Sequence, residues 1–169
     1  MKKKLTVKEI LESKGKKKLT QVYVHTPLEA NACEESDIDM IVSSENNNFK
    51  FLRESSLNTF FTVGLQYGRY LSEYEIIKRS FQLFEMGADA IYCPQSARFI
   101  KAIANEGIPV VGHTGFIPYK LTHYGGFKAY GKNLIEAKKI LNEIYILQDA
   151  GAFATEIEIV PEEIVQMIC

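Results

Sequence analysis

The amino-acid sequence predicts an α/β protein whose strands, about six in number and parallel, form an incomplete β/α barrel. Helix-like and strand-like segments alternate along the 169 residues. A helix end, a glycine and a short apolar strand also recur in that order three times, at 85–94, 105–113 and 149–158. Such repeats are typical of βα units, whose strands pair in parallel. A closed barrel of this class has eight strands, so either the barrel is incomplete or another chain covers the gap.

The first half of the chain is expected to supply three of the strands. Residues 6–13 predict a short amphipathic helix, because Thr6 and Glu9 have the spacing of a capping box. A second helix is expected from Pro27 to about residue 36. Three β-rich segments predict strands at 21–25, 39–43 and 59–64.

The second half is expected to repeat the βα unit. Ser72 begins a strong helix that runs through Phe84 with its apolar residues on one face. Each of the three repeats then supplies one strand, and the glycine before each strand ends the preceding helix. The long loop at 116–132 is expected either to cover a substrate or to be a plain turn.

Composition excludes several classes of protein. Lys and Arg number 20 against 21 Asp and Glu, for a formal net charge of -1, which argues against broad nucleic-acid binding. The lysines near the N-terminus are expected to be solvated. The three cysteines form no CxxC pair, and no apolar run approaches a membrane span. We expect residues 1–169 to be a single cytoplasmic domain with reduced thiols and no membrane partner.

His113 is the first candidate site residue. It stands in the segment Gly112-His113-Thr114-Gly115, at the expected tip of the fifth strand. Function in β/α folds gathers at these carboxyl ends. The flanking glycines let backbone approach a ligand closely, and an imidazole can donate to a carboxylate or an oxyanion. This position favours a functional histidine over a structural one.

Glu158 is the second candidate. Glu156 and Glu158 alternate with isoleucines, so both carboxylates lie on one face of the sixth strand. If that face is the barrel interior, burial raises the pKa of a glutamate near the strand tip and suits it to take a proton next to a carbonyl. The alternative is a solvent-facing pair on an exposed edge.

Several motifs in order now resemble one enzyme family. They are the segments at 107–115, 125–132, 149–152 and 158–161, together with Pro118. In this order and spacing they are similar to ketopantoate hydroxymethyltransferase. The resemblance implies a β/α barrel of the phosphoenolpyruvate/pyruvate superfamily. It also implies transfer of a one-carbon unit from methylenetetrahydrofolate to 3-methyl-2-oxobutanoate, in pantothenate biosynthesis.

The resemblance assigns roles to individual residues. His113 would hold the 2-oxo acid, and Glu158 would be the general base that takes the proton from C3. The family's second-strand Gly-Asp-Ser motif falls on Ser44, Glu45 and Asn46. This position makes Ser44 and Asn46 candidates for binding substrate, and makes Glu45 the candidate metal ligand.

Other family positions are changed. A metal-binding aspartate falls on Gly64, and a lysine and a glutamate of the fourth strand fall on Tyr92 and Pro94. Tyr92 becomes a candidate substrate-binding residue. Magnesium requires oxygen ligands. Of the metal-binding carboxylates that the resemblance implies, only the one at Glu45 is kept, so magnesium is possible but its binding is doubtful.

Three hypotheses follow. The chain is a hydroxymethyltransferase-like enzyme acting on a 2-oxo acid through Glu158, or it is a catalytically inactive or repurposed paralogue that binds a small acid or assembles with a partner chain. In a third variant Tyr92, Glu45 and His25 act without a metal. The unpaired strand edges of an incomplete barrel, and the family resemblance, predict a homo-oligomer.

Overall fold

Six short parallel strands form one curved sheet in the computed structural model, which describes residues 2–45 and 49–168. The strands are β1 (Gln21–Tyr23), β2 (Met40–Ser44), β3 (Phe60–Gly64), β4 (Ala90–Tyr92), β5 (Val110–Gly115) and β6 (Ala154–Glu158). Their order in the sheet is their order in the chain, and every neighbouring pair is parallel. The predicted fold class is confirmed: the sheet is a curled half-barrel.

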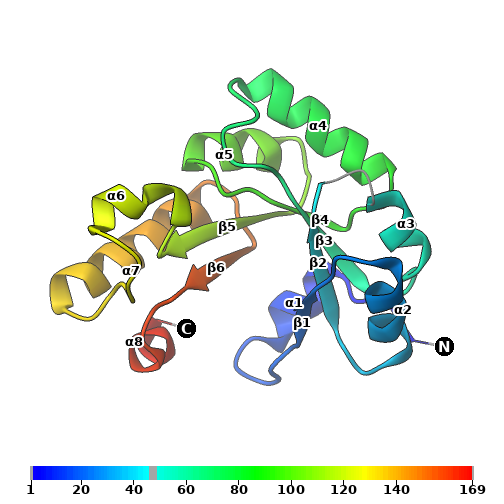
Figure 1. The fold of residues 1–169 in the computed structure, drawn as a ribbon, viewed down its shortest axis with the longest axis horizontal. Coiled ribbons are helices and arrows are strands. Elements are labelled where there is room, and N and C mark those ends of the chain that lie inside the picture. The colour runs from blue at the N-terminus through cyan, green and yellow to red at the C-terminus, as the bar shows by residue number, and fades with distance from the viewer. Residues whose placement is uncertain (1, 46–48, 169) are drawn as a thin grey trace.

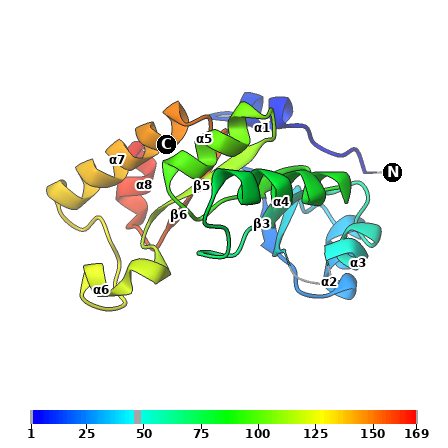
Figure 2. The same ribbon diagram turned by 90° about the horizontal axis from the view of Figure 1, so that it is seen from above.

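Helices surround the outer face of this sheet as an arc, whereas the opposite side is open (Figure 1). Seen from above, α4 and α5 lie in front of the strands, and α7 follows them toward one end of the molecule (Figure 2). The helices are α1 (Val7–Ser13), α2 (Pro27–Glu35), α3 (Phe49–Glu54), α4 (Glu73–Glu85), α5 (Ala97–Asn105), α6 (Leu121–Tyr124), α7 (Leu134–Asp149) and α8 (Glu162–Ile168), with a 3-10 turn η1 at Pro118–Lys120.

The main core lies between the sheet and the helices. Alternate residues of each strand point outward, and Ile41, Phe61 and Ile91 are fully buried there. Ile100 and Ile103 of α5 are also fully buried in this core. The other set of alternate residues points into the barrel interior, so the strand pattern that builds the core also selects the side chains that face a ligand.

The predicted helix boundaries are confirmed in detail. Thr6 and Ser72 each accept from the backbone three residues on and complete capping boxes at α1 and α4. Gly87, Gly107 and Gly151 have φ angles of 100°, 76° and 94°, which is the left-handed conformation that glycine adopts most easily after a helix. The three repeats are therefore three copies of one local structure.

Several elements differ from the expectation. The short helices α3 and α8 were not anticipated, and α8 follows the sixth strand. The loop at 116–132 contains η1 and α6 rather than irregular backbone throughout. Lys2 and Lys4 are not simply solvated: Lys2 donates to Thr59, and Lys4 pairs with Asp89 at 2.8 Å.

β1 and β6 are the two edges of the sheet, and within residues 2–45 and 49–168 neither edge pairs with a further strand. β6 is half-buried or exposed along its whole length, unlike the buried strand β3. Among the described residues, no helix is both long enough and apolar enough to cross a membrane.

Candidate active site

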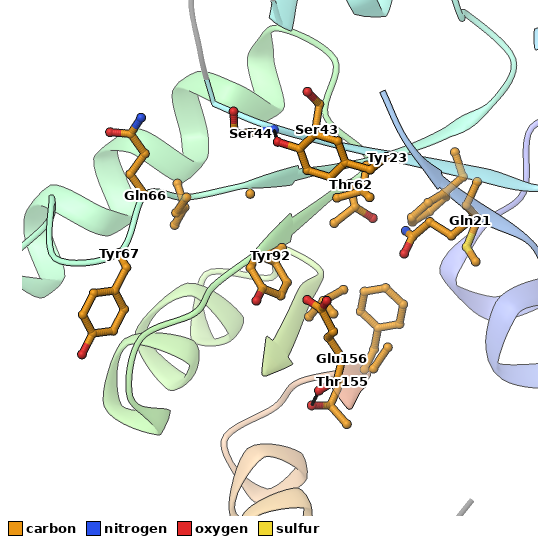
Figure 3. Close-up of a pocket in the computed structure, with 18 of the residues that line it drawn as sticks. Gln21, Tyr23, Ser43, Ser44, Thr62, Gln66, Tyr67, Tyr92, Thr155 and Glu156 are labelled. Carbon is orange, nitrogen blue, oxygen red and sulfur yellow. Dashed lines mark hydrogen bonds between the residues drawn. The ribbon is translucent and has the colours of Figure 1, made fainter. Parts of the chain in front are cut away.

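A cavity of about 730 Å³ lies inside the half-barrel. Side chains from all six strands line it, because every second strand residue points inward. Ile10 of α1 also lines it. Its polar residues include Ser44 and Tyr92 at the carboxyl ends of β2 and β4, and Thr62 and Glu156 in the middle of β3 and β6 (Figure 3). The strand pattern of the sequence thus gives the cavity a partly polar lining.

Strands β5 and β6 bring the two predicted site residues together. Nε2 of His113 lies 3.0 Å from Oε2 of Glu158. The side chain of His113 is 4% exposed and that of Glu158 is 28% exposed. The two atoms are in ion-pair contact, although Nε2 has no partner aligned as a hydrogen bond. His113 contacts Tyr92, which lines the cavity, but neither His113 nor Glu158 lines the cavity itself.

Gly115 allows the backbone of β5 to lie unusually close to the backbone of β6 at Glu158. Its φ is 87°, and the amide of the next residue, Phe116, donates to the carbonyl of Glu158 at 2.8 Å. A Cβ at position 115 would lie 2.5 Å from that carbonyl oxygen, which is closer than any side chain tolerates. Ile159, directly after Glu158, has a φ of 48°, a strained value for a β-branched residue. The strand tip at Glu158 is thus held in an unusual conformation by its neighbours.

Tyr92 extends the group on the other side of His113. Its hydroxyl lies 2.7 Å from Nδ1 of the imidazole. Burial raises the pKa of Tyr92 well above its ordinary value, and the carboxylate of Glu156, which interacts with the hydroxyl, raises it further. The side chains of Tyr92 and Glu156 point toward one another in the cavity (Figure 3). Gly64 on the neighbouring strand leaves space for the tyrosine ring, since a Cβ there would lie 3.4 Å from it.

The electrostatics of Glu158 suit a general base. Burial raises the pKa of its carboxyl, the adjacent Glu156 carboxylate raises it further, and the imidazole of His113 acts in the opposite direction. A carboxylate with a raised pKa binds a proton more readily, and a base works best when its pKa approaches the working pH. The arrangement can therefore accept a proton from carbon next to a carbonyl.

The remaining predicted residues are separated. Ser44 lines the cavity and its amide donates to the hydroxyl of Tyr23 at 3.2 Å. Ser44, Gly64 and Tyr92 occupy one register position on β2, β3 and β4, so Gly64 separates Ser44 from Tyr92. Asn46 lies outside the described residues. His25 is exposed and packs against the ring of Tyr23, away from the imidazole and carboxylates of β5 and β6.

Glu45 has partners that do not fit a metal ligand. Its side chain is fully buried, and Oε2 lies 2.6 Å from Nε of Arg79. The hydroxyl of Tyr70 and the amide of Gln66 also donate to this carboxylate. A divalent ion would have to displace a guanidinium that already neutralises the charge. Elsewhere in the described residues, no three His, Cys, Asp or Glu side chains gather as a metal-binding group.

Glu156 is the residue whose importance the sequence interpretation missed. The alternation on β6 placed it beside Glu158, but its partner Tyr92 belongs to β4, two strands away. The strand register offers the signal that was overlooked, because His113 pairs directly with Glu156. Two side chains at one register position of a parallel pair necessarily lie close together.

Comparison with known proteins gives consistent results. Residues 46–169 match the family model described as ketopantoate hydroxymethyltransferase. The chain is 28% identical to the 3-methyl-2-oxobutanoate hydroxymethyltransferase of Kosmotoga olearia, over 97% of this chain and 70% of that one. The enzyme of the same name from Thermosipho africanus is 29% identical, with 71% of its length covered.

Among solved structures, the carboxyl transferase domain of Rhizobium etli pyruvate carboxylase resembles 81% of this chain with a TM-score of 0.58. The sequence identity is 12%, so this likeness concerns the fold alone. The chain spans about a quarter of that structure, because it matches 26% of it. A half-barrel of this kind is thus part of a larger architecture in that protein.

Proposed function

Because the chain belongs to the ketopantoate hydroxymethyltransferase family, we propose that it transfers a hydroxymethyl group, or carries out related enolate chemistry, on a 2-oxo acid with Glu158 as general base. The observation that supports this proposal most directly is the contact between His113 and Glu158 at the tips of β5 and β6. It joins a carboxylate of raised pKa to an imidazole beside a cavity of suitable size.

In this reaction, each site residue would have a separate role. The substrate, 3-methyl-2-oxobutanoate or a close analogue, enters the cavity and meets Tyr92 and Ser44, which line it. Glu158 takes the proton from C3, so that the C3–H bond breaks and an O–H bond forms on the carboxylate. Both ring nitrogens of His113 already face protein groups, so we assign this imidazole to holding Glu158 and Tyr92 rather than to the substrate.

The chain's own residues do not fit a magnesium ion at the expected site. Glu45 is paired with Arg79, and Gly64 stands where the family resemblance implies an aspartate. In this proposal the enolate oxygen is met by a hydrogen-bond donor, Tyr92, instead of a metal. The one-carbon donor implied by the family is methylenetetrahydrofolate, and the rings of Tyr67 and Tyr119, stacked at 4.2 Å beside the cavity, offer a flat surface to a heteroaromatic group.

Proton exchange at C3 tests the proposal directly. The protein is mixed with 3-methyl-2-oxobutanoate in deuterium oxide, with EDTA or with magnesium, and the C3 proton is followed by NMR. We expect exchange that Glu158→Gln abolishes, while Glu162→Gln, an exposed carboxylate of α8, leaves it unchanged. Exchange that survives Glu158→Gln would remove Glu158 from the role of base.

A second candidate function is binding of a small acid without chemistry. The ion pair of Glu45 with Arg79, which occupies the expected metal position, favours it. In this case 2-oxo acids would raise the melting temperature, and C3 exchange would be absent with and without magnesium. A lack of both effects would exclude both functions.

A further inference from the structure

A second cavity, of about 270 Å³, lies beside His113 near the carboxyl ends of β4 and β5. We refer to it as the small cavity; it is lined by residues of the β4–α5 connection, of η1 and of α7. Tyr67 lines both the small cavity and the main one, and it lies at one side of the main cavity (Figure 3). His113 lines the small cavity and contacts Glu158. The small cavity is therefore a neighbour of both the main cavity and the proposed base.

Gln95 brings an unsatisfied acceptor to the wall of the small cavity. Its Nε2 donates to the backbone carbonyl of Tyr70 at 2.9 Å, and this bond fixes which way the amide group is turned. Oε1, at the other end of the amide, is buried and has no hydrogen-bond partner in the described part of the chain. Because buried polar atoms are nearly always paired, this oxygen indicates a ligand that carries a hydrogen-bond donor.

Glu143 adds further acceptor capacity from α7. Its Oε2 accepts from the hydroxyl of Thr114 at 2.7 Å. An ionised carboxylate has about four lone-pair sites, so this one bond leaves it able to accept from two N–H groups of a ligand. Lys120, at the end of η1, contributes an ammonium group, which only donates. The small cavity thus combines acceptors on two elements with a donor on a third.

This polar pattern does not suit the 2-oxo acid of the proposed reaction. The ionised acid carries acceptor oxygens and no donor, so it would leave Oε1 of Gln95 unpaired and would meet the like charge of Glu143. A flat heterocycle with an amino group, a ring N–H and a carbonyl on one edge has donors for Gln95 and Glu143 and an acceptor for Lys120. The pteridine ring of a tetrahydrofolate carries these three groups side by side.

The size of the small cavity limits how much of such a molecule it can hold. Sites for drug-sized ligands have volumes of about 300–1,000 Å³, and about 270 Å³ lies just below this range. The space is therefore sufficient for a two-ring heterocycle and not for a whole folate. The ring of Tyr67 and the buried side chain of Leu147 add apolar surface for the faces of the heterocycle.

We propose that the small cavity binds the pteridine ring of the one-carbon donor, with Glu143 and Gln95 accepting from its N–H groups and Lys120 donating to its carbonyl. This inference rests on the proposed function, because it identifies the place of the second reactant in that reaction. The 2-oxo acid then occupies the main cavity, and the two reactants meet beside His113 and Glu158.

Isothermal titration calorimetry of the free protein tests this inference without turnover. The probe is 5-formyltetrahydrofolate, a stable compound with the same ring, and the comparison ligand is p-aminobenzoylglutamate, which has the tail of a folate and lacks the ring. We expect the protein to bind the first compound and to bind the second much more weakly. Failure of the wild-type chain to bind 5-formyltetrahydrofolate, or equal binding of both compounds, would overturn the proposal.

Glu143→Gln is the decisive variant, because it keeps an oxygen for Thr114 and loses the charge and one acceptor. Hydrogen bonds to a charged group are the stronger kind, so we expect Kd for 5-formyltetrahydrofolate to rise about 10- to 100-fold. Asp149→Asn removes an exposed carboxylate at the end of the same helix and should leave Kd unchanged. Equal effects of these two substitutions would contradict the inference. If Glu143→Gln does not fold, Gln95→Leu carries the test and should weaken binding several-fold.

Titration with 3-methyl-2-oxobutanoate distinguishes the other possible occupant of the small cavity. If the acid bound there through Lys120, Glu143→Gln would tighten its binding by removing a like charge, and that result would overturn the proposal. The proposed function can also fail separately. Binding of 5-formyltetrahydrofolate that depends on Glu143, together with absent C3 exchange, would remove the enzyme proposal and leave the ring site in place.

Discussion

Nε of Arg79 lies 2.6 Å from the buried carboxylate of Glu45, so an arginine of α4 neutralises the charge at the end of β2. Removing one partner of a buried pair leaves a charge without compensation, which typically costs about 3–5 kcal/mol. We therefore expect Arg79→Met to lower the free energy of unfolding by an amount in this range, measured by urea denaturation. Arg69→Met, which removes an exposed arginine bound to Gln66, is the control and should cost little.

Adding Glu45→Gln to Arg79→Met should recover most of this loss, because the unpaired charge disappears. If the double variant were as unstable as Arg79→Met, the cost would come from lost packing of the arginine rather than from charge.

Divalent ions should have no effect on C3 exchange by the wild-type protein. The carboxylate of Glu45 already accepts from Arg79, Tyr70 and Gln66, so a metal ion finds no free ligand there. The measurement is the exchange rate after dialysis against EDTA, before and after magnesium is added. A rate lost with EDTA and restored by magnesium would show that the cation acts in the reaction.

Glu158→Gln should change how stability depends on pH. The pKa of Glu158 is raised in the folded protein, so the folded state holds this proton more tightly than the unfolded state. Its contribution to stability is present below the unfolded pKa and is lost as the pH rises through the folded pKa. Relative to the wild type, Glu158→Gln should therefore gain stability as the pH rises.

Thermal unfolding of both proteins across acidic to neutral pH measures this difference. Glu162→Gln is the control, because its carboxylate is exposed at the start of α8. A difference between wild type and Glu158→Gln that is constant with pH would show that the raised pKa of Glu158 is absent.

Gly115→Ala should damage both stability and exchange. The residue has a φ of 87°, and its Cβ would lie 2.5 Å from the carbonyl oxygen of Glu158. Strain of this kind costs on the order of 1–3 kcal/mol, and its relief would move Glu158. Gly125→Ala is the matched control: its φ is 73°, but nothing lies within 4 Å of the added atom.

The control should therefore show the cost of the backbone conformation alone, with normal exchange. Equal effects of the two substitutions in urea denaturation and in the exchange assay would mean that the close approach to Glu158 is unimportant.

Association of the chain with itself is a further expectation. β1 and β6 are sheet edges that pair with no other strand in the described part of the chain, and open edges favour association. Sedimentation at micromolar concentration should give a mass that is a multiple of 19.2 kDa. A monomer at this concentration would contradict the expectation.

Much of the fold followed from local patterns in the sequence. The glycines at 87, 107 and 151 mark the helix ends because each one adopts a positive φ, and the capping boxes mark two helix starts because both partners are close in the chain. The helices α3 and α8 escaped prediction, since six or seven residues carry too little periodicity by themselves. The equally short α1 was identified only from the capping-box spacing of Thr6 and Glu9.

Residues of the candidate site could be predicted only where the sequence of a single strand identifies them. Alternation placed Glu156 and Glu158 on one face of β6, and the flanking glycines identified His113. The partners of Glu45 could not be predicted, because Arg79 lies 34 positions away and its direction depends on how α4 packs. The link from Tyr92 to His113 likewise depends on the strand register of β4 and β5.

Because the order of strands in the sheet is their order in the chain, each strand completes its pairing with the one made just before it. Every step closes only a single βα segment, so the loss of chain entropy at each step is modest and folding can advance from one end. β6 is the final strand in this order, it is incompletely buried, and it carries both glutamates of the site. Because β6 is paired with β5 alone in the described residues, local opening of that one strand would displace Glu156 and Glu158 and inactivate the site while the other five strands stay paired.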